Sequence, residues 1–248
     1  MSRRRFLSPP LNGSMTRYSK PLTTFPKTLL ILGTDLAGKD HCANVLTDAA
    51  QAAGILVERR RGAFSGQADD RRSSENKSAL NLWMERLFLA ALPLHCRLLP
   101  FLTALLVWRD IRRFRPPAEG AVLVVSHTAV RLLAFALGHL FDRVEDIRMP
   151  WLADRALRGI VPATGARTLV LDIDHAVRAA RMAAREQRGS LDHFDRYMGQ
   201  DPVRSERIEQ FLVWIGATYL KAERIENNHL SDAELLEAFI GSPAKLPG

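Results

Sequence analysis

Residues 28–40 read TLLILGTDLAGKD. The first five positions form a solid apolar run of the kind found in parallel strands that are buried on both faces. A glycine-rich turn follows this run, and a helical pattern begins at Lys39 and continues to about Ala53, where Gly54 stops it. A buried strand that leads through such a turn directly into a helix predicts an α/β fold.

The turn between this strand and helix matches a phosphate-binding pattern. Gly33, Gly38 and Lys39 occupy the fixed positions of G-x-x-x-x-G-K. In such a loop the backbone N–H groups surround a phosphate at the helix N-terminus, and the lysine reaches the β- and γ-phosphates. The predicted nucleotide contacts are Gly33, Thr34, Ala37, Gly38, Lys39, Asp40 and His41. Two alternatives remain open: a glycine-rich turn that binds no nucleotide, and a retained loop that has lost catalysis.

The residue after Lys39 departs from the pattern. The pattern has Ser or Thr at this position, with a hydroxyl that binds Mg²⁺, whereas this chain has Asp40. A carboxylate also binds Mg²⁺, directly or through water, although it places negative charge beside the phosphates. Asp40 is therefore a predicted metal ligand.

Strands and helices alternate along the rest of the chain. Apolar runs predict strands at 121–125 and 168–172, an apolar start predicts one at 55–61, and a last strand is predicted at 223–226. Helical patterns occur at 129–139, 151–158, 175–188, 202–221 and 231–241. Residues 79–115 are helical and strongly apolar, with breaks at Pro93 and Pro100. We predict a three-layer α/β/α fold with a five-stranded, mostly parallel sheet. One domain spans residues 27–248 and follows a disordered basic tail at 1–26.

The chain carries a formal net charge of +8, and 29 of its 35 basic residues are Arg. Arg side chains form bidentate contacts with phosphate and carboxylate groups, which favours anionic partners. No aromatic-interleaved basic patch or nucleic-acid-binding module accompanies the charge, so nucleic acid is not the expected partner. Cys42 and Cys96 are far apart in apolar surroundings, which excludes a disulfide-built module and indicates a reducing compartment.

The amino terminus, with arginines at 3–5, is similar to a twin-arginine export signal. An apolar segment should follow such a signal, but residues 8–27 begin with Ser-Pro-Pro and are mostly polar. We therefore predict no export and a cytoplasmic protein.

Over most of residues 27–241 the chain resembles the thymidylate kinase branch of the P-loop nucleoside monophosphate kinases. The likeness rests on the loop at 33–40, the run at 169–174 with its acidic end, the arginines of the next helix and the segment at 189–194. It implies a P-loop NTPase of the nucleotide kinase type with a helical lid, which uses ATP and Mg²⁺. In that family an acidic residue third in the loop contacts the sugar of the acceptor nucleotide, and Asp35 stands there.

The resemblance also implies roles for charged residues after the fourth predicted strand. Asp172 is implied as a metal-side carboxylate near the loop. The implied catalytic cations, which neutralise the transferring phosphoryl group, are Lys39, Arg181, Arg185 and Arg188. Independently of the resemblance, Arg178 and these three arginines are spaced by 3, 4 and 3 positions, so they share one helix face. A solvated arginine face is the alternative.

The chain departs from this family where the acceptor should bind. After the third strand the family has Asp-Arg and an aromatic residue, whereas this chain has Ser126, His127 and Thr128. Ser126 offers a hydroxyl and His127 a phosphate donor or proton-handling group. The predicted acceptor-side residues are therefore Asp35, Ser126 and His127.

Two further departures concern the acceptor. The family's Glu-Pro-Gly turn after the second strand is replaced by residues 61–64. The position of an acceptor-phosphate arginine falls on Leu92, or on Arg109 in a shifted register. The acceptor is therefore predicted only as an anionic small molecule.

Residues 87–108 form an apolar stretch of 22 residues with one formal charge, Arg97. Its length approaches that of a membrane-spanning helix, but the central arginine and two prolines argue against a span. Trp83, Trp108 and the arginines at 109, 112, 113 and 115 flank the stretch as interfacial anchors would. Core packing, a homodimer interface and contact with the inner face of the membrane all remain open.

The sequence as a whole predicts an ATP-binding phosphotransferase that uses Mg²⁺. The alternative is a catalytically silent P-loop protein that binds nucleotide, with association at a membrane surface.

Overall fold

The computed structural model describes residues 25–33, 36–61, 64–65, 83, 86–90, 98–126, 128–191 and 193–240. Five strands form one sheet: β1 (Thr28–Gly33), β2 (Leu56–Arg61), β3 (Ala121–Ser126), β4 (Ala166–Asp172) and β5 (Glu223–Glu226). Their order is β2-β3-β1-β4-β5, and every neighbouring pair is parallel. The predicted α/β class with a five-stranded sheet is confirmed, and the sheet is parallel throughout.

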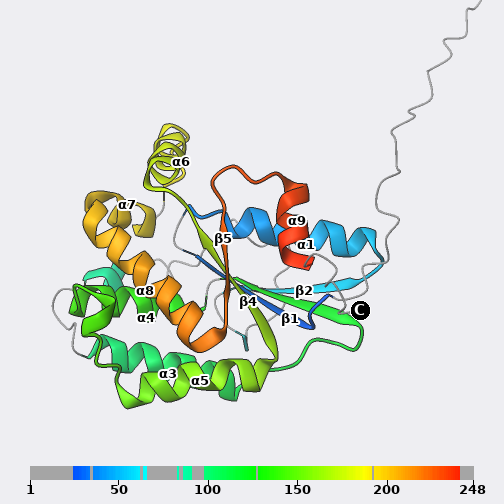
Figure 1. Ribbon diagram of the computed structural model, residues 1–248, viewed down its shortest axis with the longest axis horizontal. Coiled ribbons are helices and arrows are strands. Elements are labelled where there is room, and N and C mark those ends of the chain that lie inside the picture. The colour runs from blue at the N-terminus through cyan, green and yellow to red at the C-terminus, as the bar shows by residue number, and fades with distance from the viewer. Residues whose placement is uncertain are drawn as a thin grey trace, which may run out of the picture.

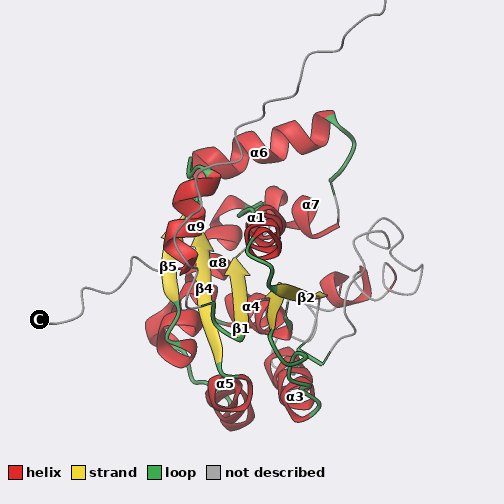
Figure 2. Cartoon of the chain, turned by 90° about the vertical axis from the view of Figure 1, so that its right-hand side faces the viewer, coloured by secondary structure: helices red, strands yellow, loops and turns green. Residues whose placement is uncertain are grey.

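Helices cover both faces of this sheet, as Figure 1 and Figure 2 show. One face carries α1 (Lys39–Ala52) and α9 (Asp232–Ile240). The other carries α3 (Leu99–Arg112), α4 (Ala129–Leu140), α5 (Trp151–Thr164) and α8 (Pro202–Leu220). Beyond the carboxyl ends of the strands lies α6 (His175–Gln187), and α7 (His193–Gln200) follows it; a short 3₁₀ turn, η2 (Val144–Asp146), follows α4. The arrangement has three layers.

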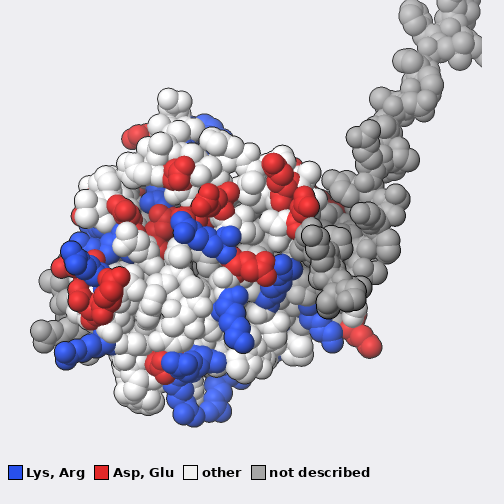
Figure 3. Space-filling view, in the orientation of Figure 1, with Lys and Arg blue, Asp and Glu red and all other residues white. Residues whose placement is uncertain are grey.

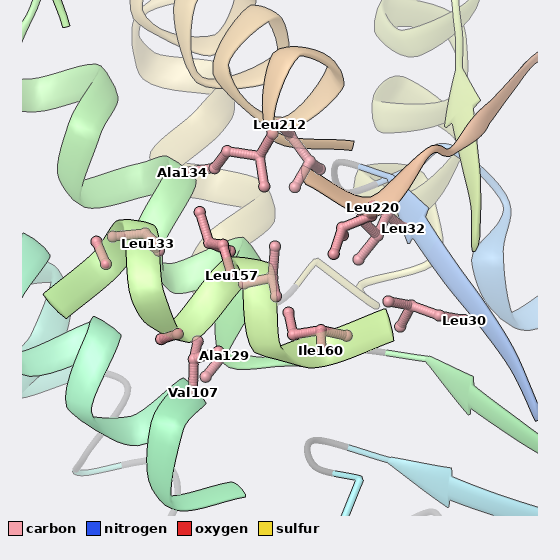
Figure 4. Close-up of a cluster of buried hydrophobic side chains, with 14 of the residues drawn as sticks. Leu30, Leu32, Val107, Ala129, Leu133, Ala134, Leu157, Ile160, Leu212 and Leu220 are labelled. Carbon is pink, nitrogen blue, oxygen red and sulfur yellow. The ribbon is translucent and has the colours of Figure 1, made fainter. Parts of the chain in front are cut away.

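Alternate residues of the strands enter two separate cores, because successive side chains of a strand point to opposite faces. Leu30 and Leu32 of β1 enter the core shared by α3, α4, α5 and α8, where Figure 4 shows them with Ile160. Leu29 and Ile31 enter the second core, under α1 and α9. Burial on both faces explains why β1 is a continuous apolar run in the sequence.

The parallel register brings three strand ends to one edge of the sheet. Gly33 at the end of β1 pairs with Leu171 of β4, and Ile31 pairs with Ser126 at the end of β3. In open α/β sheets, ligands bind outside this carboxyl edge. The predicted nucleotide loop, Ser126 and Asp172 therefore all extend from the edge where a ligand is expected.

The helices differ from the sequence prediction in three places. The predicted helix at 151–158 continues through Pro162 to Thr164, and the N–H of Gly165 then donates to the Val161 carbonyl. α7 has no counterpart in the prediction. Pro100 lies in the first turn of α3 instead of breaking a helix, because the N–H that proline lacks has no intrahelical acceptor there.

Residues 1–24 of the predicted tail and much of the stretch at 79–97 lie outside the described residues. Phe25, at the predicted boundary of the tail, packs against the core under α1 and α9. Trp83 and residues 86–90 are helical. Within the described part of the chain, no helix combines the length and the apolar character needed to cross a membrane.

Candidate functional site

The turn after β1 is shaped by the two glycines of the phosphate-binding pattern. A Cβ on Gly33 would lie 3.0 Å from the Leu171 carbonyl oxygen and 3.1 Å from the Ala37 Cβ, so the close approach of β4 excludes a side chain. Gly38 has a φ of +85°, and a Cβ there would lie 2.6 Å from the Nδ2 atom of Asn227. The observed backbone therefore requires glycine at both positions.

The N-terminus of α1 opens from this turn. Gly38 is the N-cap, and no side chain among the described residues caps the helix there. The N–H groups of a first helical turn have no acceptor within the helix. Lys39 begins the helix and is buried, whereas Asp40 and His41 are exposed, and His41 Nε2 lies 2.9 Å from Oδ1 of Asp232 in α9. The N–H dipoles at a helix N-terminus favour an anion, and a lysine in the first helical position adds positive charge at the same end of the helix.

Asn227 fixes the turn from the far end of the chain. It is buried directly after β5, where its N–H donates to the Asp172 carbonyl over 2.7 Å. Its side-chain amide donates to the Ala37 carbonyl, also over 2.7 Å. Sequence analysis missed this residue, because an Asn after a strand is common in turns and carries no signal of a distant partner.

Arg181 of α6 reaches the turn after β1. Its Nη1 donates to the Leu36 carbonyl over 2.8 Å, and its Nη2 donates to the Asn227 carbonyl over 2.9 Å. Burial lowers the pKa of the Arg181 guanidinium from its ordinary value. Arg181 therefore contacts the turn through backbone carbonyls, and its action on a transferring phosphoryl group stays a prediction.

Two other arginines of α6, Arg178 and Arg185, form ion pairs with neighbouring helices. Arg178 forms an ion pair with Glu209 of α8, and Arg185 Nη1 lies 2.7 Å from Oδ2 of Asp195, a fully buried carboxylate in α7. Arg188 Nε donates to the carbonyl of its own helix, at residue 184, over 3.0 Å. The alternative of a solvated arginine face is wrong for Arg178, which is only 5% exposed.

Asp172 lies at the end of β4, and the alternation of the strand places it on the α8 face. Val170, two positions earlier, enters the core that contains α8 residues. Oδ2 of Asp172 accepts a hydrogen bond of 2.8 Å from Nε of Arg224 in β5. Within the described residues, no group of three His, Cys, Asp or Glu side chains is placed to hold a metal ion. Asp40 is exposed at the start of α1, and a carboxylate at this position is compatible with a magnesium ion bound mainly by phosphate oxygens and water. Asp172 pairs with Arg224.

The end of β3 contributes Ser126, which is buried beside β1. Shortly after it, on the first turn of α4, Arg131 lies over two aromatic rings, 4.7 Å from the centroid of Phe194 and 5.5 Å from that of Phe135. Sequence analysis did not select Arg131, because one arginine among 29 is not distinctive until its position near the end of β3 is known.

Three predicted residues, Thr34, Asp35 and His127, lie outside the described residues, as does Leu92. Arg109, the alternative acceptor arginine, is exposed on α3. Its neighbour in sequence has a structural role instead: the Asp110 carboxylate accepts 2.8 Å hydrogen bonds from the N–H groups of Phe64 and Ser65, after β2. Phe64 and Ser65 are therefore held by α3.

No known protein-family model matches this chain, and no curated protein shows significant similarity to it. The functional argument therefore rests on the geometry of the site.

Proposed function

We propose that the chain is a P-loop NTPase of the nucleotide kinase type, which binds ATP at residues 33–41 and transfers a phosphoryl group to an anionic small molecule. One observation carries the proposal. A parallel strand ends in a turn where Gly38 is a left-handed N-cap without a side-chain cap among the described residues, directly before the buried Lys39. This turn extends from the carboxyl edge of the sheet, where α/β folds bind ligands.

In this proposal the first-turn N–H groups of α1 and the Lys39 ammonium hold the β- and γ-phosphates. Asp40 is an oxygen ligand of a magnesium ion. When it is bound, this ion would neutralise part of the phosphate charge. Gly33, Ala37 and Gly38 form the backbone of the turn, with Thr34 between them in sequence.

The lid supplies further positive charge to the same edge. Arg181 is already hydrogen-bonded to the carbonyls that flank the turn, and Arg185 and Arg188 follow on the same helix. Positive charge that is fixed before the reaction stabilises the transferring phosphoryl group at little reorganisation cost. On the acceptor side, the proposal assigns Asp35, Ser126 and His127, and it adds Arg131 as a cation near the end of β3.

A second candidate function, nucleotide binding without catalysis, is favoured by the ion pairs of the lid. Arg178 pairs with Glu209, Arg185 with Asp195, and Asp172 with Arg224. In a kinase of the resembled type, some of these side chains would contact phosphate or the metal ion. In this chain they form ion pairs with neighbouring helices and strands.

The deciding experiment is an ATP-consumption assay across nucleoside monophosphates, nucleosides, and sugar and lipid phosphates, run beside ATP titration calorimetry. We expect turnover with one acceptor class, and Lys39→Ala should abolish both turnover and ATP binding. The control is Lys27→Ala, which removes an exposed lysine just before β1. ATP binding with no turnover on any acceptor supports the silent alternative, and unchanged binding in Lys39→Ala overturns both functions.

A further inference from the structure

The outer side of α3 carries an unusual number of exposed apolar side chains. We call these six residues the α3 outer face: Leu98, Phe101, Leu102, Leu105, Leu106 and Trp108. They are between 36% and 61% exposed. The opposite side of the helix, with Leu99, Ala104 and Val107, is buried against the core.

From its N-terminus to Trp108, α3 is therefore apolar all round. Surface helices of globular domains carry polar residues on the side that faces water, and a contiguous apolar patch on the surface marks a contact with another apolar phase or partner. The face runs from Leu98 to Trp108, which is about 15 Å along the helix axis.

The exposed charged residues between positions 98 and 115 all have the same sign. Arg109, Arg112, Arg113 and Arg115 follow the apolar side chains and are exposed. The guanidinium of Arg112 lies 4.9 Å from the centre of the Trp108 ring. Between residues 98 and 115 the one acidic side chain is Asp110, which is buried and accepts two backbone hydrogen bonds from the turn after β2.

A second helix extends the surface. α5 packs beside α3, with Gly159 facing Ile111, and both helices lead to the amino ends of their strands, so they run in the same direction. Trp151, at the start of α5, is 71% exposed. Figure 3 shows Lys and Arg atoms gathered along the lower edge of the molecule, where Figure 1 places α5.

We propose that the α3 outer face, with its arginines, binds the surface of an anionic lipid bilayer, with the helix lying in the interfacial plane. Leucine side chains enter the acyl boundary, Trp108 and Trp151 lie at headgroup level, and the arginines contact lipid phosphates. A second copy of the chain fits less well, because the face brings four arginines and no exposed carboxylate to pair with them.

This surface is independent of the proposed nucleotide site. In both Figure 1 and Figure 2, α3 and α5 lie at the opposite end of the molecule from α6. A chain bound through α3 therefore keeps the lid and its edge of the sheet turned away from the bilayer, toward the aqueous phase.

The test is vesicle flotation of the full chain with phosphatidylcholine vesicles that contain either one quarter phosphatidylglycerol or none. We expect binding to the anionic vesicles. Leu102→Glu/Leu105→Glu should weaken that binding at least about tenfold, since two inserted leucines are replaced by charges. The matched control is Val203→Glu/Ala217→Glu, which makes the same charge change at two exposed positions of α8 and should leave binding unchanged. Circular dichroism verifies that both variants remain folded.

The arginines are tested separately with Arg109→Gln/Arg113→Gln. Each lost charge should weaken binding to anionic vesicles about fivefold, with a shallower dependence on salt. Flotation of Leu102→Glu/Leu105→Glu at the wild-type level overturns the proposal, as does equal binding to neutral and anionic vesicles. It is also overturned if the wild type does not float and is instead a dimer by light scattering that Leu102→Glu/Leu105→Glu converts to a monomer.

Discussion

The side-chain amide of Asn227 donates a 2.7 Å hydrogen bond to the carbonyl of Ala37, a residue 190 positions earlier in the chain. Arg181 connects the same two segments, because it donates to the carbonyls of Leu36 and Asn227. The turn after β1 is therefore held by the loop after β5 and by α6, in addition to its own glycines. This arrangement makes the turn's shape sensitive to residues outside the phosphate-binding pattern.

Replacing Asn227 by Ala should destabilise the fold and weaken ATP binding together. The change leaves the buried Ala37 carbonyl without its donor, which costs about 1–3 kcal/mol. Urea unfolding and titration calorimetry measure the two effects. Asn228→Ala is the matched control, because the Asn228 side chain bonds only with Asp174 among the described residues. Equal effects from the two variants would contradict a specific role for Asn227.

Gly38→Ala should lower stability by more than Gly54→Ala does. Both glycines have a positive φ, at +85° and +76°, so alanine is strained at either position. Only at Gly38 does the added Cβ also meet an atom, Nδ2 of Asn227, at 2.6 Å. The difference between the two variants in the free energy of unfolding therefore measures the cost of the close contact with Asn227. If the two variants unfold at the same denaturant concentration, the Asn227 side chain moves aside without cost.

Arg185→Ala should destabilise the chain, because it removes the cation that lies 2.7 Å from the fully buried Asp195 carboxylate. Arg185 itself is partly exposed, and solvent screening limits the expected loss to about 1–3 kcal/mol. Arg188→Ala, on the same helix, removes a bond to an exposed backbone carbonyl and should change stability by less than about 0.5 kcal/mol. Thermal unfolding compares them. Equal melting temperatures would show that Arg185 does not hold α7 in place.

Acid should destabilise the fold through His139. Burial lowers the pKa of His139 from its usual 6.5, and its Nδ1 lies 2.8 Å from the Phe135 carbonyl. The folded chain keeps this imidazole neutral while the unfolded chain protonates it, so its contribution to stability is present above pH 6.5 and is lost as the pH falls.

For one group of this kind, the free energy of unfolding changes by at most about 1.4 kcal/mol per pH unit. Urea unfolding of the wild type and of His139→Gln between pH 7.5 and 5 measures it, and the variant should show the flatter profile. His229→Gln, at an exposed position, serves as the control. A variant profile as steep as that of the wild type would assign the acid sensitivity to other groups.

Local sequence patterns were sufficient for most of the sheet. β1 and β3 are apolar runs because both faces of each strand are buried. The end of α5 was not predictable in the same way. Gly159 and Pro162 indicate a stop, yet the helix continues to Thr164, and Gly159 packs toward Ile111 of α3, a contact that the local pattern does not specify.

The residues of the candidate site also fall into those that a local pattern predicts and those that it does not. Gly33, Gly38 and Lys39 are recognisable because one local motif contains them all. Asn227 and Arg131 were missed, since their roles depend on contacts between elements that are distant in sequence. The pairing of Asp172 with Arg224 also depends on the neighbouring strand, which a local pattern does not specify.

The strand order leaves β2 and β5 as the two edges of the sheet. An edge strand presents unpaired backbone groups that invite pairing with a strand of another molecule. β2 ends in Glu-Arg-Arg-Arg and β5 reads Glu-Arg-Ile-Glu. β5 offers only four residues to pair with, and three of them are exposed charged residues that an approaching strand would have to desolvate. These charged residues therefore protect this edge of the sheet against pairing with another molecule.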